Sequence, residues 1–213
     1  MNLRLLIWDW NGTIIEDADL CLAIENELLR ERNMPEITRA WYLAHFSFPI
    51  RRYYEMMGYT FERESFEAVS EIFMERYRKR FMHCPLRSGV TDVLREARRR
   101  GIRQTLLSVT QQDDLVEQVR ALGAEEYFSE ILGQVDILGT SKLDRAKDYM
   151  ARMGIDPADA LFIGDTDHDA EAAKAVGCRC ALMEGGHQSR EVLLRCGVPV
   201  YASAEALSNV LFD

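Results

Sequence analysis

The sequence predicts an α/β fold built around a parallel sheet. Short apolar runs, each bounded by Gly, Asp or Pro, alternate with stretches of helical periodicity. This alternation implies βαβ units, which place helices against a parallel sheet. One long segment near the N-terminus interrupts the alternation and contains no clear strand. The expected architecture is therefore a three-layer α/β core with an inserted all-helical domain.

Five apolar runs are expected to form the strands. The first, Leu3–Trp8, leads directly into Asp9 and the turn-forming pair Asn11-Gly12, which indicates a buried strand entering a tight turn. The other four are similarly short: Ile102–Val109, Ala160–Ile163, Cys178–Met183 and Val198–Tyr201.

The helical segments are marked by their faces and their ends. Residues 90–100 carry an apolar stripe, end in three arginines and stop at Gly101, as a helix with cations in its last turn does. In the insertion, apolar residues recur on one helical face in two stretches, Leu20-Ile24-Leu28 and Phe66-Val69-Phe73-Tyr77. We therefore expect a core of residues 1–15 and 85–213 and a helical domain of residues 16–84.

Composition limits the class of function. The formal net charge of -9 argues against nucleic-acid binding, which needs a basic surface. No apolar run approaches the roughly 18 residues of a membrane span, and the N-terminal run is too short for a signal peptide. Five scattered cysteines suggest neither a disulfide framework nor a zinc site. We expect a cytoplasmic protein, monomeric or homodimeric, without nucleic-acid or membrane partners.

Polar residues follow the expected strands at the points where ligands bind in an open parallel sheet. They are Asp9, Asn11 and Thr13 after the first strand, Ser108 after the second, Lys142 at a helix start, and Asp165 and Asp169 after a later strand. The sheet should gather them at one edge. Carboxylates, a hydroxyl and a lysine together suit a phosphate group and Mg²⁺.

These residues also carry a resemblance to a known family. Asp9-Trp10-Asn11-Gly12-Thr13, Ser108, Lys142 and Gly164-Asp165-x-x-x-Asp169 resemble, in order and spacing, the four motifs of the haloacid dehalogenase-like hydrolase superfamily. The resemblance covers nearly the whole chain, and the insertion looks like the helical cap of the first type. It implies a Rossmann-like core and a phosphatase of small phosphorylated metabolites. The phosphoglycolate-phosphatase-like branch is the most similar.

The resemblance implies a role for each motif residue. Asp9 would attack phosphorus and form an aspartyl-phosphate. Asp9, the backbone carbonyl of Asn11 and Asp165 would hold Mg²⁺, with Asp169 as a direct or water-mediated ligand.

The remaining candidates would bind substrate. Ser108 would donate to a phosphate oxygen, and Lys142 would neutralise the phosphoryl group and the nucleophile. Thr13 would help to cradle phosphate beside turn amides. In the cap, Arg51 or Arg52 would clamp a substrate carboxylate or a second phosphate.

Asn11 departs from the family pattern, because many phosphatases of the superfamily have an aspartate there as general acid and base. Asparagine cannot transfer a proton, and such catalysis contributes roughly 10²–10⁴-fold. The motif loops offer four candidate substitutes: Glu16, Asp17, His168 and His187. Two alternatives stay open beside the phosphatase: a phosphate- and metal-binding regulatory protein with little turnover, and a phosphotransferase or mutase.

Overall fold

The computed structural model describes residues 3–135 and 143–212. Six parallel strands form one sheet of order β3-β2-β1-β4-β5-β6. They are β1 (Leu5–Trp8), β2 (Arg103–Gln111), β3 (Glu130–Gln134), β4 (Ala160–Gly164), β5 (Arg179–Met183) and β6 (Val200–Tyr201). All five expected strands are present, so the predicted α/β class is confirmed. The edge strand β3 was not expected, because its sequence Glu-Ile-Leu-Gly-Gln is half-exposed and has no apolar run.

Helices cover both faces of the sheet. The side chains of β1 alternate between two apolar clusters, with Leu6 and Trp8 on one face and Leu5 and Ile7 on the other. One face is covered by α5 (Val90–Arg99), α6 (Gln112–Ala121) and α10 (Ala204–Phe212), and the other by α7 (Leu143–Met153), α8 (Asp167–Val176) and α9 (Arg190–Leu194). This is the three-layer arrangement expected from the sequence.

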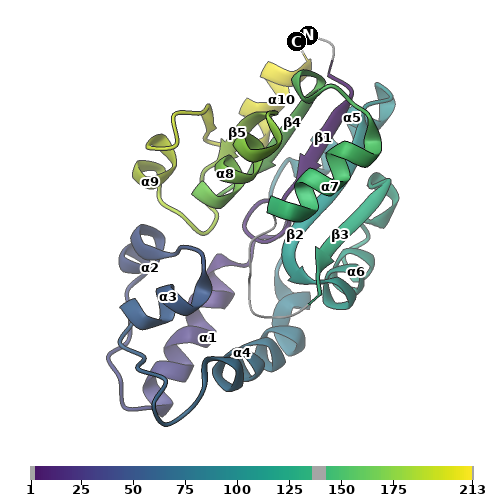
Figure 1. Cartoon of the computed structure of the whole chain (residues 1–213). Coiled ribbons are helices and arrows are strands. Elements are labelled where there is room, and N and C mark those ends of the chain that lie inside the picture. Colours follow the sequence, from purple (N-terminus) through teal and green to yellow (C-terminus); the bar gives the residue numbers. More distant parts are fainter. Residues whose placement is uncertain (1–2, 136–142, 213) are drawn as a thin grey trace.

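Four helices between β1 and α5 form a separate cap: α1 (Ala18–Glu31), α2 (Arg39–His45), α3 (Ile50–Met56) and α4 (Phe66–Arg80). Figure 1 shows them together beyond the sheet, on the side toward which β1 leads. They share their own apolar cluster, which is rich in buried tyrosine and phenylalanine. The cap therefore has a core of its own and forms one wall of the space between itself and the sheet.

The cap is held against the core through the loop that follows β5. The Tyr42 hydroxyl lies 2.6 Å from Nδ1 of His187, and Nε2 of Gln188 donates to the Phe46 carbonyl at 2.8 Å. The Phe46 ring also stacks on His187, with centroids 4.9 Å apart. These contacts bring α2 over the carboxyl ends of the strands.

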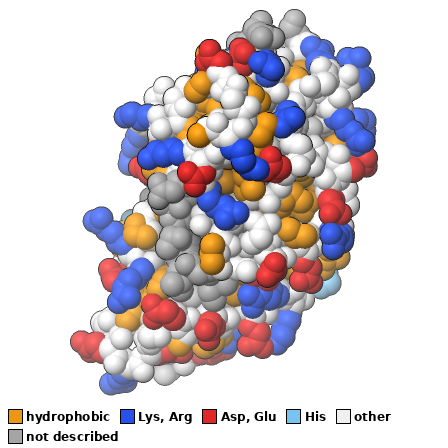
Figure 2. Space-filling view, turned by 45° about the vertical axis from the view of Figure 1, so that its right-hand side comes forward, with side chains coloured by type: hydrophobic (Ala, Val, Ile, Leu, Met, Phe, Trp, Pro, Cys, Tyr) orange, Lys and Arg blue, Asp and Glu red, His pale blue; other side chains and the backbone are white. Residues whose placement is uncertain are grey.

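The surface is mixed in charge. Basic and acidic side chains are interspersed over the face shown in Figure 2. Among the described residues, no helix has the length and apolar character needed to cross a membrane.

Candidate active site

Three carboxylates meet at the carboxyl ends of the two central strands. Strands β1 and β4 pair with Trp8 opposite Ile163, so Asp9 and Asp165 emerge side by side. Asp169 lies in the first turn of α8. One oxygen from each of these three buried aspartates lies within 4.8 Å of the others. Such a group of oxygen ligands is what a small, hard divalent cation requires.

Hydrogen bonds fix two of these carboxylates. Asp165 accepts from the Thr13 hydroxyl at 2.7 Å and from the backbone N–H of His187 at 2.6 Å. Asp169 accepts from the backbone N–H groups of Asp165 and Thr166 at 3.1 and 3.0 Å. Asp169 thus caps the start of α8 and ties this loop to the carboxylate cluster.

The electrostatics of this cluster favour a bound cation. Burial raises the pKa of Asp165, His187 opposes that shift, and the neighbouring Asp169 adds to it. A divalent cation would offset the repulsion between the carboxylates and the cost of burying them. The donor set therefore fits Mg²⁺, which Asp9, Asp165, Asp169 and the Asn11 carbonyl would hold.

Gly12 allows the first motif loop to approach Asp165. Its φ of +68° lies in the left-handed region, and a Cβ there would lie 2.3 Å from a carboxylate oxygen of Asp165. Its backbone N–H donates to Asp17 at 2.8 Å, and its carbonyl accepts from Arg87 at 2.7 Å. Glycine is therefore required by both conformation and space.

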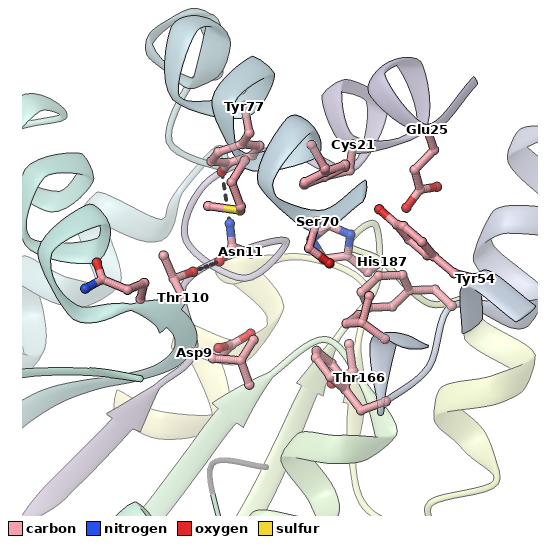
Figure 3. A pocket seen from close by; sticks show the side chains of 17 residues that line it. Asp9, Asn11, Cys21, Glu25, Tyr54, Ser70, Tyr77, Thr110, Thr166 and His187 are labelled. Carbon is pink, nitrogen blue, oxygen red and sulfur yellow. Dashed lines mark hydrogen bonds between the residues drawn. The ribbon is translucent and has the colours of Figure 1, made fainter. Parts of the chain in front are cut away.

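The Asn11 amide is held from three directions. Its Nδ2 donates to a carboxylate oxygen of Asp17 at 2.7 Å and lies 2.9 Å from the Tyr77 hydroxyl, while its Oδ1 accepts from the Thr110 hydroxyl at 2.7 Å. Figure 3 shows Asn11 between Tyr77 and Thr110, close to Asp9. Both polar atoms of the amide are thus occupied by protein groups. The side chain is a fixed, neutral part of the site.

Asp17 and His187 form a buried ion pair behind Asn11. Nε2 of His187 lies 3.4 Å from Asp17. Burial acts to raise the pKa of Asp17, but the charge of His187 and hydrogen bonds from His187, Asn11 and Tyr77 lower it overall. Burial acts to lower the pKa of His187, yet the hydrogen bond and charge of Asp17, with Asp165 and Asp9, raise it to about 9. The two groups therefore stabilise each other's charged forms.

The structure separates the four candidate substitutes for the missing general acid. Asp17 is completely buried, and its two oxygens already accept from Gly12, Asn11 and Tyr77. Glu16 is exposed, and His168 stacks against Phe48 of the cap with centroids 4.6 Å apart.

His187 does line the cavity between cap and core. Its two ring nitrogens, however, face Asp17 and Tyr42.

Ser108 and Thr13 lie beside the cluster and are fully buried. Ser108 Oγ accepts from the Thr110 backbone N–H at 3.1 Å and lies 3.2 Å from the Thr110 hydroxyl. The Thr13 hydroxyl donates to Asp165. The structure therefore brings both residues to the expected edge, where they hold neighbouring site residues in place.

Two of the expected cations lie elsewhere. Arg51 pairs with Glu55 at 3.4 Å, lies over the Phe61 ring and keeps 53% of its side chain exposed. Arg52 is also exposed, and neither arginine is part of the cavity lining. Lys142 lies outside the described residues.

Several residues of the site gave no motif in the sequence. Tyr77 and Glu25 lie on cap helices α4 and α1, and Thr110 lies at the end of β2. Glu25 could have been suspected from the sequence, because it adjoins the apolar helical face formed by Ile24 and Leu28. A charged residue in such a position is rarely buried unless it is paired.

Comparison with known proteins identifies the family. The sequence model described as haloacid dehalogenase-like hydrolase matches residues 6–183, most of the chain. The chain belongs to this family.

Relatives and neighbours agree with this assignment. Phosphoglycolate phosphatase 1 of Pseudomonas aeruginosa is 30% identical over 86% of this chain and 70% of that protein. N-acetylmuramic acid 6-phosphate phosphatase of Pseudomonas putida is 27% identical over 88% of this chain and 85% of that protein.

Among solved structures, a predicted phosphatase from Clostridium acetobutylicum superposes with a TM-score of 0.82 at 17% identity, covering 98% of each chain. The expected superfamily is thus confirmed, and the phosphatase relatives support a phosphoric monoester hydrolase.

Proposed function

We propose that this haloacid dehalogenase-like hydrolase is a Mg²⁺-dependent phosphatase of a small phosphorylated metabolite that works through an aspartyl-phosphate on Asp9. The observation that carries the proposal is the buried cluster of Asp9, Asp165 and Asp169 at the edge of the sheet. It supplies a nucleophile and a cation site at one point. The phosphatase relatives support the same class of reaction.

The reaction would proceed in two displacements at phosphorus. A carboxylate oxygen of Asp9 attacks, the bond to the ester oxygen breaks, and the organic group leaves as an alkoxide or phenoxide. Water then attacks the phosphoryl group, and the Asp9 carboxylate is released with inorganic phosphate. A bound Mg²⁺ would neutralise charge on the phosphoryl oxygens.

Each of the other side chains around Asp9 has its own proposed role. Ser108 and Lys142 are proposed to bind the phosphoryl oxygens, and Thr13 to orient Asp165. Asn11 donates no proton to the leaving group, because its amide does not ionise and is held by Asp17 and Thr110. The first step should therefore favour leaving groups that are stable without a proton.

The test is phosphate release from a panel of phosphate monoesters with and without Mg²⁺. The panel begins with phosphoglycolate and N-acetylmuramic acid 6-phosphate, named for the relatives, and includes 4-nitrophenyl phosphate. Release that needs Mg²⁺, disappears in Asp9→Ala and persists in the exposed control Asp92→Ala supports the proposal. Release that survives Asp9→Ala would sink it.

A second candidate is a phosphate- and metal-binding regulatory protein with little turnover. The Asn11 amide favours it, because no aspartate at that position can transfer a proton in either displacement. Mg²⁺-dependent binding of a phosphate ester, with no phosphate released from any member of the panel, would identify it.

A further inference from the structure

A cavity of about 140 Å³ lies between the cap and the carboxylate cluster. Asp9 and Asn11 line it from the core, while Glu25 and Tyr54 line it from the cap (Figure 3). An apolar cavity of roughly 150 Å³ in another protein accommodates benzene. Because the phosphoryl group must also fit beside Asp9, the organic group that this cavity can hold is no larger than about a single ring.

Aromatic rings form much of the cap side of this cavity. Five belong to the cap: Phe46, Phe48, Tyr54, Phe73 and Tyr77. Ring pairs prefer stacked or edge-to-face contacts, which favour an aromatic ligand beyond the area that it buries. The walls thus suit a flat, apolar group.

Away from the carboxylate cluster, the described lining has no cationic side chain placed to pair with a ligand carboxylate. Among the described residues that line the cavity there is no lysine or arginine. His187 can carry a charge, but its ring nitrogens face Asp17 and Tyr42. A carboxylate placed here would lose its hydration without gaining a counter-charge.

The cap end of the cavity is polar without being strongly charged. The carboxyl of Glu25 is buried and accepts from the Tyr53 hydroxyl at 2.8 Å. Burial raises the pKa of Glu25 to about 8, against the smaller opposing effect of that hydrogen bond. The neutral form of the carboxyl is therefore favoured at the cap end of the cavity.

The lack of a proton donor at the core end of the cavity also favours an aromatic leaving group. Asn11 supplies no proton to the leaving oxygen, so a phenoxide is a better leaving group here than an alkoxide. Cavity shape, lining charge and leaving-group chemistry are three separate properties, and all three favour one class of substrate.

We propose that the cavity binds an uncharged aromatic ring, so that the substrate is a small aryl phosphate monoester without a carboxylate. This inference rests on the proposed phosphatase function and names the substrate class for the same site.

Binding of non-hydrolysable analogues tests the inference without turnover. Calorimetry in the presence of Mg²⁺ would compare phenylphosphonate with its 4-carboxy derivative. We expect phenylphosphonate to bind at least roughly tenfold more tightly, because the added carboxylate finds no cationic partner in the described lining. Equal or tighter binding of the 4-carboxy derivative, or no binding of either compound, would overturn the inference.

A matched pair of variants locates the effect in the cavity. Met74 lines the cavity, so Met74→Lys adds a cation there and should raise the affinity for the 4-carboxy derivative relative to phenylphosphonate. Thr60→Lys adds the same charge at an exposed cap position outside the lining and should leave that ratio unchanged. If both variants change the ratio equally, the selectivity does not come from the cavity.

Turnover separates this inference from the function on which it rests. If phenyl phosphate and 4-carboxyphenyl phosphate release phosphate equally well through Asp9, the substrate class is wrong and the phosphatase stands. If phenylphosphonate binds selectively but no ester is cleaved, the phosphatase is wrong and the binding preference stands.

Discussion

Asp165 and Glu25 are buried acids associated with the two ends of the cavity. Asp165 belongs to the floor, which is the cluster of Asp9, Asp165 and Asp169, and Glu25 belongs to the roof, which the cap side chains form. Burial raises the pKa of both carboxyl groups. Their neighbours differ. Asp165 shares its place with Asp9 and Asp169, so a divalent cation can compensate three carboxylates together. Glu25 accepts from the Tyr53 hydroxyl, and a proton is enough to neutralise it. A bound cation would thus offset the cost of burial at the floor, and protonation offsets it at the roof.

Asn11 lies between the floor and the roof and carries no charge. Its amide accepts from Thr110 on the core side and donates toward Asp17 and Tyr77 on the cap side. An aspartate at this position would add a further ionisable carboxyl between floor and roof. Under the proposed function, phosphoryl chemistry would take place at the floor and the organic group would be recognised at the roof.

The largest effect should come from the floor. Asp165→Asn removes one cation ligand, and we expect kcat/KM on 4-nitrophenyl phosphate to fall by at least about 10²-fold, as chelation of Mg²⁺ should in the wild type. Mg²⁺ should also raise the Tm of the wild type but not of this variant. The exposed Asp92→Asn serves as the control. A variant that keeps both wild-type activity and the Mg²⁺-dependent rise in Tm would show that the floor is not a cation site.

Asn11→Asp should supply the general acid that the site lacks. The new carboxyl can supply a proton, so hydrolysis of an alkyl phosphate should rise by about 10²-fold, while aryl phosphates gain less. An unchanged or lower rate on alkyl phosphates would show that another group handles the proton.

The same change should cost stability. The new carboxyl replaces an amide that lies 2.7 Å from a carboxylate oxygen of Asp17, and the free energy of unfolding should fall by about 1–3 kcal/mol. Combining Asn11→Asp with Asp17→Asn exchanges the amide and the carboxylate and should recover part of that loss. Urea denaturation of the two single variants and the double variant measures the coupling; strict additivity would contradict it.

A smaller effect is expected at the roof. The pKa of Glu25 rises from 4.5 to about 8 on folding, so the folded state binds the proton more tightly than the unfolded state. The stabilising effect of protonation is complete below pH 4.5 and is lost as the pH rises through 8. Glu25→Gln should remove this contribution and flatten the decline of the unfolding free energy between pH 5 and 8. Parallel wild-type and variant profiles would contradict the assignment.

The floor could be predicted from the sequence, and the roof could not. Asp9 and Asp165 follow short apolar strands, and parallel pairing brings such residues to one edge whatever the loops do. The roof depends on how four cap helices pack, and Glu25, Tyr54 and Tyr77 come from three of them. Arg51 and Arg52 were suggested by their place in a polar-aromatic stretch of the cap, but their helix leaves both exposed.

Two other features could not be predicted from the sequence, for physical reasons. The edge strand β3 has only two adjacent apolar residues, Ile131 and Leu132, so periodicity does not distinguish it from a loop. The hydrogen bonds of Asn11 join residues from the cap and from two core segments, a contact that no local pattern encodes.

The most direct test of phosphoryl transfer to Asp9 is a rapid-quench reaction with excess 4-nitrophenyl phosphate and Mg²⁺. Because no aspartate at position 11 can activate the hydrolytic water, the second displacement should be slower than the first. A burst of 4-nitrophenol equal to the enzyme concentration should therefore precede steady turnover. Peptide mass mapping of the acid-quenched protein should find the phosphoryl group on Asp9. Turnover without a burst and without phosphorylated Asp9, or with the phosphoryl group on another residue, would contradict the account.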